Sequence, residues 1–308
     1  MKKNREFFLV DNFYDKVVGS LIGLAVGDAL GAPLKDNRRL NRRLLKKPAF
    51  MKSSVVCDPI VDMIGGGPFN LAPGEWSNET SMAIALSESL IRCNGFNEKD
   101  LLLRFADWLK RGKYSHRGEC FDLDQTTQIA ILDSLQSGNP FGGSYDPELT
   151  GHGSIARVAP VAMFYNEDPK SAFHVVTQQS RLTHADPLCL NICQQMMLDF
   201  LNMYRGFAPQ QIWKDDVKNM KQEEIQTMYV KGVYDAAKWA IQNTDNFKDA
   251  VLLAVNLRAR DSDSVGAVTG ELAGAAYGLS GIPPEWVEKL AWKEYLLRLA
   301  DRIYYDED

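Results

Sequence analysis

Two ladders of glycine constrain the fold of this chain more than any other feature. Eight glycines recur at four-residue spacing in two segments: Gly19, Gly23, Gly27, Gly31, Gly266, Gly270, Gly274 and Gly278. This spacing leaves a bare stripe along a helix, although each glycine costs up to about 1 kcal/mol of helix stability relative to alanine. Such a stripe is favourable where two backbones approach closely. We therefore expect central helices over 16–31 and 264–279, whose stripes either face each other or contact different neighbours.

Helical periodicity dominates the rest of the chain, and no series of segments alternates with period two. Apolar residues recur at helical spacing in these segments: 81–92, 101–109, 125–136, 171–181, 187–203, 209–219, 223–243, 247–256 and 284–303. The breaks are short and rich in Gly, Pro, Asn and Asp. The pattern predicts one all-α domain over 1–308, with an N-terminal extension at 1–15 and an irregular or mobile segment at 36–70.

Charge and cysteine content narrow the class of protein. The net charge is −5, which argues against binding nucleic acid through overall charge. Asp28 interrupts the apolar segment 17–34, and no signal peptide is recognisable before it. The five cysteines form no CxxC pair and are expected to be free thiols in a reducing compartment. We expect a monomeric cytoplasmic protein that contacts neither nucleic acid nor a membrane.

A basic segment lies between Asp36 and Lys47, with six Lys and Arg residues and interleaved leucines. It is consistent with a solvated amphipathic helix or mobile loop. A docking patch for an anionic ligand or acidic partner is the less favoured alternative. The sequence does not separate these interpretations.

Two clusters of oxygen-bearing side chains stand at predicted helix starts. Asp261, Asp263 and Ser264 precede one helix, and Trp76 is followed by the run 77–80, which is Ser-Asn-Glu-Thr. Taken singly, each cluster is typical of an N-terminal cap. If the two helix ends meet, their oxygens could instead hold one or two divalent cations.

Two further elements suit a phosphate-bearing ligand. The turn Gly151–Ser154 leads into a segment that contains Arg157, and glycine-rich turns before a helix offer backbone N–H groups to phosphate. His184 lies in the run Thr-His-Ala-Asp-Pro over 183–187. Each element taken alone is consistent with a plain turn or a structural histidine.

In their order along the chain, these elements resemble the ADP-ribosylglycohydrolase family, which includes the enzyme that reactivates dinitrogenase reductase. The resemblance spans about residues 16–300 and is carried by Gly-Asp-Ala-Leu-Gly-Ala-Pro at 27–33, Pro-Gly-Glu-Trp at 73–76, Cys-Phe-Asp at 120–122, Gly153–Pro160, 183–187, Asp261–Gly266 and Gly-Ile-Pro at 281–283.

The resemblance implies an all-α fold around a central cleft that holds Mg²⁺ or Mn²⁺, one or two ions. By position the metal ligands would be Ser77, Asn78, Glu79, Asp261, Asp263 and Ser264. Among these, Glu79, Asp261 and Asp263 would be the catalytic residues. The ADP-ribose cleft would be lined by Gly153, Ser154, Arg157 and His184.

The chain departs from the family pattern around the implied metals. Asn78 offers a neutral oxygen where the family has an aspartate, and Glu79 is one methylene longer than the family residue. Lys35 stands where family members often carry a glutamate, and His152 replaces an asparagine. Charge counting makes two tightly bound divalent ions doubtful and leaves one ion at Asp261, Asp263 and Glu79, while Lys35 could attract the diphosphate.

Three functions follow from this comparison. The first is a divergent, divalent-metal-dependent ADP-ribosylglycohydrolase that removes ADP-ribose from modified side chains, including arginine. The alternative is a catalytically impaired protein that binds ADP-ribose or a partner such as an ADP-ribosyltransferase. A third, more remote interpretation is a changed substrate that is another N-glycoside.

Overall fold

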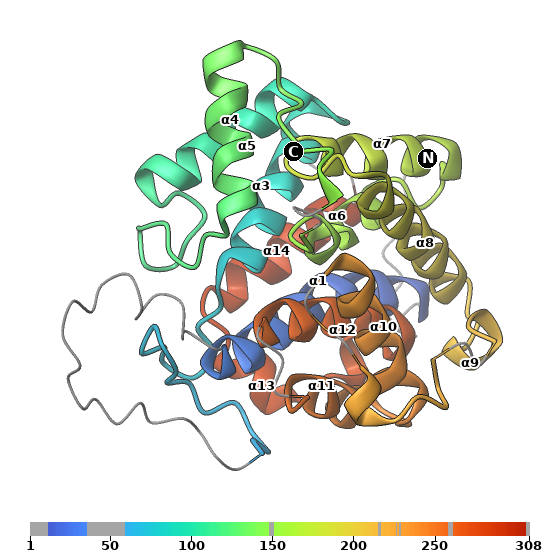
Figure 1. Ribbon diagram of the computed structural model, residues 1–308. Coiled ribbons are helices and arrows are strands. Elements are labelled where there is room, and N and C mark those ends of the chain that lie inside the picture. The colour runs from blue at the N-terminus through green and yellow to red at the C-terminus, as the bar shows by residue number, and fades with distance from the viewer. Residues whose placement is uncertain are drawn as a thin grey trace.

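The computed structural model describes residues 12–35, 59–147, 151–214, 217–225, 227, 229–257 and 261–305. This part of the chain is all-α, as predicted, and contains no strand apart from two isolated bridges (Figure 1). Its α-helices are α1 (Asn12–Gly31), α3 (Asn78–Cys93), α4 (Glu98–Arg111), α5 (Gln125–Ser137), α6 (Ala159–Phe164), α7 (Pro169–Arg181), α8 (Pro187–Tyr204), α9 (Pro209–Ile212), α10 (Val230–Gln242), α11 (Phe247–Val255), α12 (Ser262–Tyr277), α13 (Pro284–Lys289) and α14 (Lys293–Tyr305). A short 3₁₀ helix, η1 (Ala32–Leu34), extends α1.

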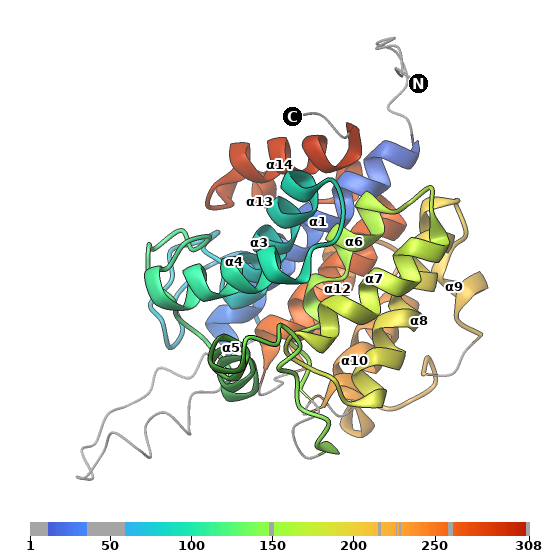
Figure 2. The same ribbon diagram turned by 90° about the horizontal axis from the view of Figure 1, so that it is seen from above.

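The two glycine stripes face each other. Helices α1 and α12 lie side by side through the middle of the molecule and run in opposite directions (Figures 1 and 2). The glycines meet as pairs: Gly19 with Gly274, Gly23 with Gly270, and Gly27 with Gly266. A Cβ atom placed on Gly27 would lie 1.9 Å from the carbonyl oxygen of Gly266, so the two backbones are in direct contact. The first of the two packing arrangements is therefore confirmed.

At the two ends of the contact between α1 and α12, the glycines do not pair helix to helix as their spacing in the sequence suggests. Helix α12 ends at Tyr277, and Gly278 follows with φ of +79°, so the second ladder has three glycines in the helix contact. The carboxylate of Asp15 packs against Gly278 and accepts a hydrogen bond from the backbone N–H of Ser280. At the other end, Gly31 lies against the backbone of Ser262 and Asp263. Helix α1 begins at Asn12, so residues 12–15 of the expected N-terminal extension are helical.

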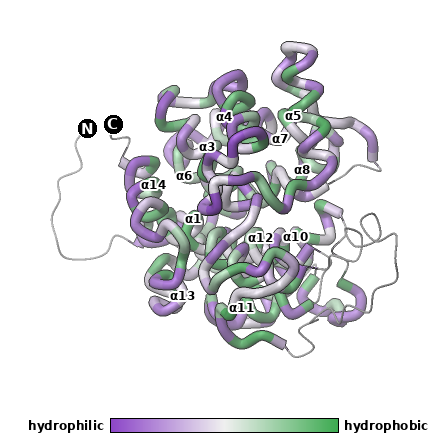
Figure 3. The backbone as a smooth tube through the Cα atoms, turned by 90° about the vertical axis from the view of Figure 1, so that its left-hand side faces the viewer, coloured by the Kyte–Doolittle hydropathy of each residue, from purple (hydrophilic) through white to green (hydrophobic). Residues whose placement is uncertain are grey.

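Other helices enclose the central pair. Helices α10 and α11 pack on α12, while α3, α6 and α14 pack on α1. Figure 3 shows α1 and α12 in the middle of the molecule with these helices around them. The segment Asn12–Leu34 is long and apolar enough to cross a membrane, but 94% of its apolar window is buried inside the protein. Contact with α12 and its neighbours accounts for that hydropathy.

Several predicted helix boundaries are wrong. Among the described residues of 209–219 only Pro209–Ile212 is α-helical, and α10 starts at Val230 rather than at residue 223. The predicted helix 284–303 is two helices, because the N–H of Ala291 donates to the carbonyl oxygen of Gly74 instead of to its own helix. The basic segment 36–47 lies outside the described residues.

The cysteines among the described residues are free thiols, as predicted. The four cysteines among the described residues, Cys93, Cys120, Cys189 and Cys193, are free. Burial raises the pKa of Cys193 to about 11, so this thiol stays protonated at neutral pH.

The close helix contact predicts a severe effect of a single methyl group. Gly27→Ala should lower the free energy of unfolding by roughly 3 kcal/mol or more, because the added Cβ overlaps a backbone carbonyl that cannot move alone. Helix propensity alone would favour the alanine by about 1 kcal/mol. Urea denaturation measures the change, with Gln128→Ala on the exposed side of α5 as the control. A Gly27→Ala protein as stable as wild type would contradict the direct backbone contact.

Candidate functional site

The site begins where α1 meets the start of α3. The carboxylate of Asp28, fully buried on α1, accepts hydrogen bonds from the backbone N–H and hydroxyl groups of both Ser77 and Thr80, at 2.6 to 3.0 Å. It therefore caps α3 from another helix, while Ser77, the N-cap residue, makes no side-chain cap of its own. Burial raises the pKa of Asp28 to about 6 although these hydrogen bonds oppose the shift.

The capped end of α3 meets the start of α12. The hydroxyl of Ser264 donates to Oε1 of Glu79, and both side chains are buried. Oε2 of Glu79 has no hydrogen-bond partner among the described residues. Burial and the charge of Asp263 raise the pKa of Glu79 to about 8. Asn78 is almost fully buried beside it, with Oδ1 3.2 Å from the hydroxyl of Ser77. The structure thus brings the two oxygen-rich clusters together, as predicted.

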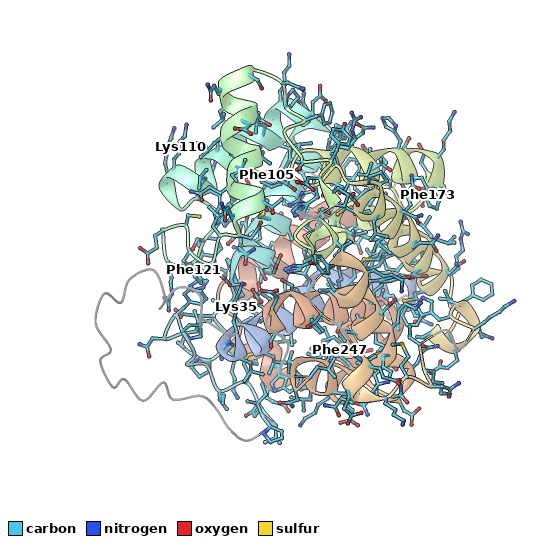
Figure 4. The ribbon with its side chains drawn as sticks, viewed as in Figure 1. Lys35, Phe105, Lys110, Phe121, Phe173 and Phe247 are labelled. Atoms are coloured by element: carbon cyan, nitrogen blue, oxygen red, sulfur yellow. The ribbon has the colours of Figure 1, made fainter. Side chains whose placement is uncertain are left out.

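Lys35 places an ammonium group inside this cluster. Its Nζ lies 2.6 Å from Oδ1 of Asp122 and 2.8 Å from Oδ2 of Asp263. Burial lowers the pKa of Lys35, but the charges of the two carboxylates outweigh burial and raise it well above its usual value. Figure 4 shows Lys35 beside the loop that carries Phe121, the neighbour of Asp122. The side chain therefore points at the carboxylates, a direction that the sequence left open.

The two carboxyls that hold Lys35 differ in acidity. Burial, together with the charge of Asp263, raises the pKa of Asp122 well above its usual range. Burial acts in the same direction on Asp263, but Lys35 and a hydrogen bond from Asp122 outweigh it and lower its pKa. Asp263 is therefore the carboxylate that carries the negative charge opposite the ammonium.

His152 brings a second basic side chain to the cluster. Its Nε2 lies 3.3 Å from Oδ2 of Asp261, and its buried Nδ1 has no partner among the described residues. Burial lowers its pKa, but the hydrogen bond and charge of Asp261, with Glu79 and Asp263, outweigh burial and raise it to about 9. Asp261 itself is one-fifth exposed, so the cluster reaches solvent here.

The loop that starts at His152 lies against a second group of polar side chains. A Cβ on Gly153 would lie 3.2 Å from Cε1 of His184 and 3.6 Å from Oδ2 of Asp124. Nδ1 of His184 is 2.8 Å from the hydroxyl of Thr183, which itself accepts from Arg157. That hydroxyl can either donate to Nδ1 or accept from it, and Nε2 of His184 has no partner in the part of the chain described.

Burial keeps His184 neutral at ordinary pH. The loss of water lowers its pKa to about 4, although the charge of Asp124 opposes this shift. The neutral ring therefore leaves Nε2, a donor or an acceptor according to the tautomer, open to a hydrogen bond with a ligand.

Ser154 and Arg157 differ from their predicted role at the ligand surface. Both side chains are fully buried. The guanidinium of Arg157 donates to Gln179, to Thr183 and to the carbonyl oxygen of Gly153, and it stacks over Phe105. The hydroxyl of Ser154 bonds to that of Ser180 on α7. These residues support the loop from inside because the turn at Gly153 directs them toward α7 rather than outward.

Comparison with known proteins agrees with this architecture. Residues 9–308 match the sequence profile of the ADP-ribosylglycohydrolase family. The chain belongs to the ADP-ribosylglycohydrolase family. A solved structure titled as an ADP-ribosylglycohydrolase-related protein complex superposes with a TM-score of 0.78 and 29% identity, over 96% of this chain and 99% of that one.

Sequence relatives in this family include hydrolases of ADP-ribosylarginine. The ADP-ribosylarginine hydrolase Tri1 of Pseudomonas putida is 37% identical over 79% of this chain and 70% of its own length, and that of Serratia proteamaculans is 38% identical over 79% and 71%. The ADP-ribosyl-[dinitrogen reductase] glycohydrolase of Rhodospirillum rubrum is 28% identical over 75% and 79%.

The site of this ADP-ribosylglycohydrolase-family chain does not fit the divalent-metal centre that the resemblance implies. One carboxyl oxygen each of Glu79, Asp122 and Asp263 is buried without an N–H or hydroxyl donor among the described residues, and carboxyl oxygens are ligands that a hard cation prefers. Yet within the described ranges no three His, Cys, Asp or Glu side chains are placed to hold a metal. The ammonium of Lys35 instead binds one oxygen of Asp122 and one of Asp263. Magnesium or manganese stays a prediction.

Three acidic residues of the site were not assigned to it from the sequence. Asp28 is the one charged residue in the apolar segment 17–34. Because a charge buried in a core must be paired, this position by itself signals that Asp28 has polar partners. Asp122 and Asp124 flank Leu123 just before α5, and Asp124 caps that helix. The fold places Asp124 near His184, on the other side of Gly153 in the chain, and no local motif signals this.

Asp28 should be essential for stability. Asp28→Ala leaves four buried donors of α3 without an acceptor, so we expect the free energy of unfolding to fall by roughly 3 kcal/mol or more. Asp28→Asn keeps one acceptor oxygen and should lose less. Asp133→Ala, exposed on α5, is the control, and urea denaturation is the measurement. Equal stability of Asp28→Ala and Asp133→Ala would show that the cap is dispensable.

Proposed function

We propose that this protein hydrolyses the glycosidic bond between ADP-ribose and an arginine side chain of a modified protein. Water adds its oxygen to ribose C1, the bond from C1 to the guanidine nitrogen breaks, and the water proton is passed on to that nitrogen. The products are ADP-ribose and unmodified arginine. The observation that carries this proposal is 37–38% identity to ADP-ribosylarginine hydrolases over 79% of the chain.

The carboxyl groups around α3 and α12 suit this chemistry. Breaking a glycosidic bond develops positive charge at ribose C1, which a nearby carboxylate stabilises. Asp261, at the solvent-reached edge, and Asp263 supply negative charge there. Oε2 of Glu79 has no hydrogen-bond partner in the described part of the chain, so it is a carboxyl oxygen able to pass a proton between water and the leaving nitrogen. These are the catalytic residues that the sequence predicted.

The part of the site around His184 and Gly153 suits binding of the ADP-ribose group. Nε2 of His184 has no hydrogen-bond partner among the described residues, while nearly all of the side chain is buried. A ribose hydroxyl would pair with Nε2 in either tautomer, and a diphosphate oxygen would accept from it in the tautomer that carries the proton on Nε2. Gly153 brings the backbone of its loop against His184, where a side chain would reduce the space.

A second candidate function is favoured by one contact. The ion pair of Lys35 with Asp263 engages a carboxylate expected to take part in chemistry. This arrangement suits a protein that binds ADP-ribose, or a partner such as an ADP-ribosyltransferase, without turnover. In that case a free monomer would bind the ligand and release no product.

The test is release of ADP-ribose from an ADP-ribosylated arginine peptide, followed by mass spectrometry. Wild type should convert the peptide. Asp261→Asn and Glu79→Gln should each lower kcat by about 10²-fold or more, because each removes a charge or proton carrier at the reacting carbon. Asp133→Asn on the surface of α5 is the matched control. Binding of ADP-ribose with no turnover by wild type would reject hydrolysis and favour the second candidate.

A further inference from the structure

The carboxylate cluster already holds a cation that belongs to the chain. Lys35 lies between Asp122 and Asp263, and its Nζ is within hydrogen-bond distance of both. Its side chain is one-fifth exposed, whereas those of Asp122 and Asp263 are 6% and 0% exposed. A carboxylate removed from water needs a positive partner, and the ammonium supplies it to Asp263.

The backbone fixes Lys35 in this place. Gly31, four residues earlier, lies so close to α12 that a Cβ there would be 2.8 Å from the Cα of Asp263. On the opposite side, the backbone of Gly67 lies against Pro33, where a Cβ would be 2.3 Å from the Pro33 carbonyl oxygen. The end of α1 is thereby held from two directions, and Lys35 reaches Asp263 over a short distance.

The second carboxyl is held as firmly. Asp122 has φ of +56°, a left-handed conformation that aspartate tolerates better than most residues. The ring of its neighbour Phe121 packs edge-on against Phe69 and His116, and Arg117 stacks over it. Asp122 is thus directed at the ammonium by a loop that aromatic contacts fix.

We propose that the ammonium of Lys35 is the resident cation of this cluster, standing between Asp122 and Asp263 where a divalent ion would otherwise bind, so that the protein takes up its ligand without a divalent metal. Lys35 uses one oxygen of each carboxyl, and a cation with six or more oxygen ligands cannot share this space with a bound ammonium. The part of the proposal that concerns the ligand rests on the proposed function. The part that concerns the cation does not.

Direct titration with Mn²⁺ tests the cation. Electron paramagnetic resonance of free Mn²⁺ should show no stoichiometric binding by wild type or by Lys35→Arg, which keeps the charge. Lys35→Glu removes the ammonium and adds a carboxylate, so it should bind Mn²⁺ and gain melting temperature when Mn²⁺ is added. Lys110→Glu makes the same charge change on the exposed side of α4, far from Lys35 in Figure 4, and should not bind.

Stoichiometric Mn²⁺ binding by wild type that Asp263→Asn abolishes would overturn the proposal. So would a folded Lys35→Glu protein that binds Mn²⁺ no better than Lys110→Glu. The wild-type titration decides the matter even if Lys35→Glu fails to fold.

Calorimetry with ADP-ribose tests the ligand separately. The Kd should be unchanged, within about twofold, between buffer with EDTA and buffer with Mg²⁺. A loss of about tenfold or more with EDTA would overturn metal-free uptake. Absence of ADP-ribose binding in both buffers would reject the proposed function, while the Mn²⁺ titration would still decide the role of Lys35.

Discussion

The contact between α1 and α12 is the constraint on which the rest of the molecule depends. Three glycine pairs let two antiparallel backbones touch, and no side chain could occupy the space between them. Because the helices cannot slide or turn without a clash, the residues at their ends have fixed positions. The end of α1 therefore meets the start of α12, and Lys35 reaches Asp263. The glycines cost intrinsic helix stability, which the extensive burial of both helices offsets.

The charged side chains of the site come from helices that are far apart in the sequence and meet in the fold. Asp28 on α1 caps α3, Glu79 on α3 accepts from Ser264 on α12, and Lys35 joins Asp122 to Asp263. Each carboxyl is buried and has a specific partner, so its protonation is set by its neighbours rather than by water.

The whole-chain architecture shows the family of this protein, whereas single side chains in the site determine its local chemistry. The architecture follows that of the ADP-ribosylglycohydrolases over nearly the whole chain. The local chemistry depends on single positions: Lys35 and His152 each bring a basic group to the carboxylates. Substitutions at such positions change the charges around the carboxylates, and so the cations that can bind there, without changing the fold.

The sequence by itself determined the helical class, the two central glycine helices and the residues of both oxygen-rich clusters, because helical periodicity and short motifs are local signals. Only the tertiary structure decided that the stripes face each other and that Lys35 turns toward Asp263. It also showed that Arg157 and Ser154 support a loop from inside, and that Asp28 caps α3 across 49 residues. These facts depend on distances between segments far apart in the chain. Local patterns carry no information about such distances, since a buried charge finds its partner only when the helices pack.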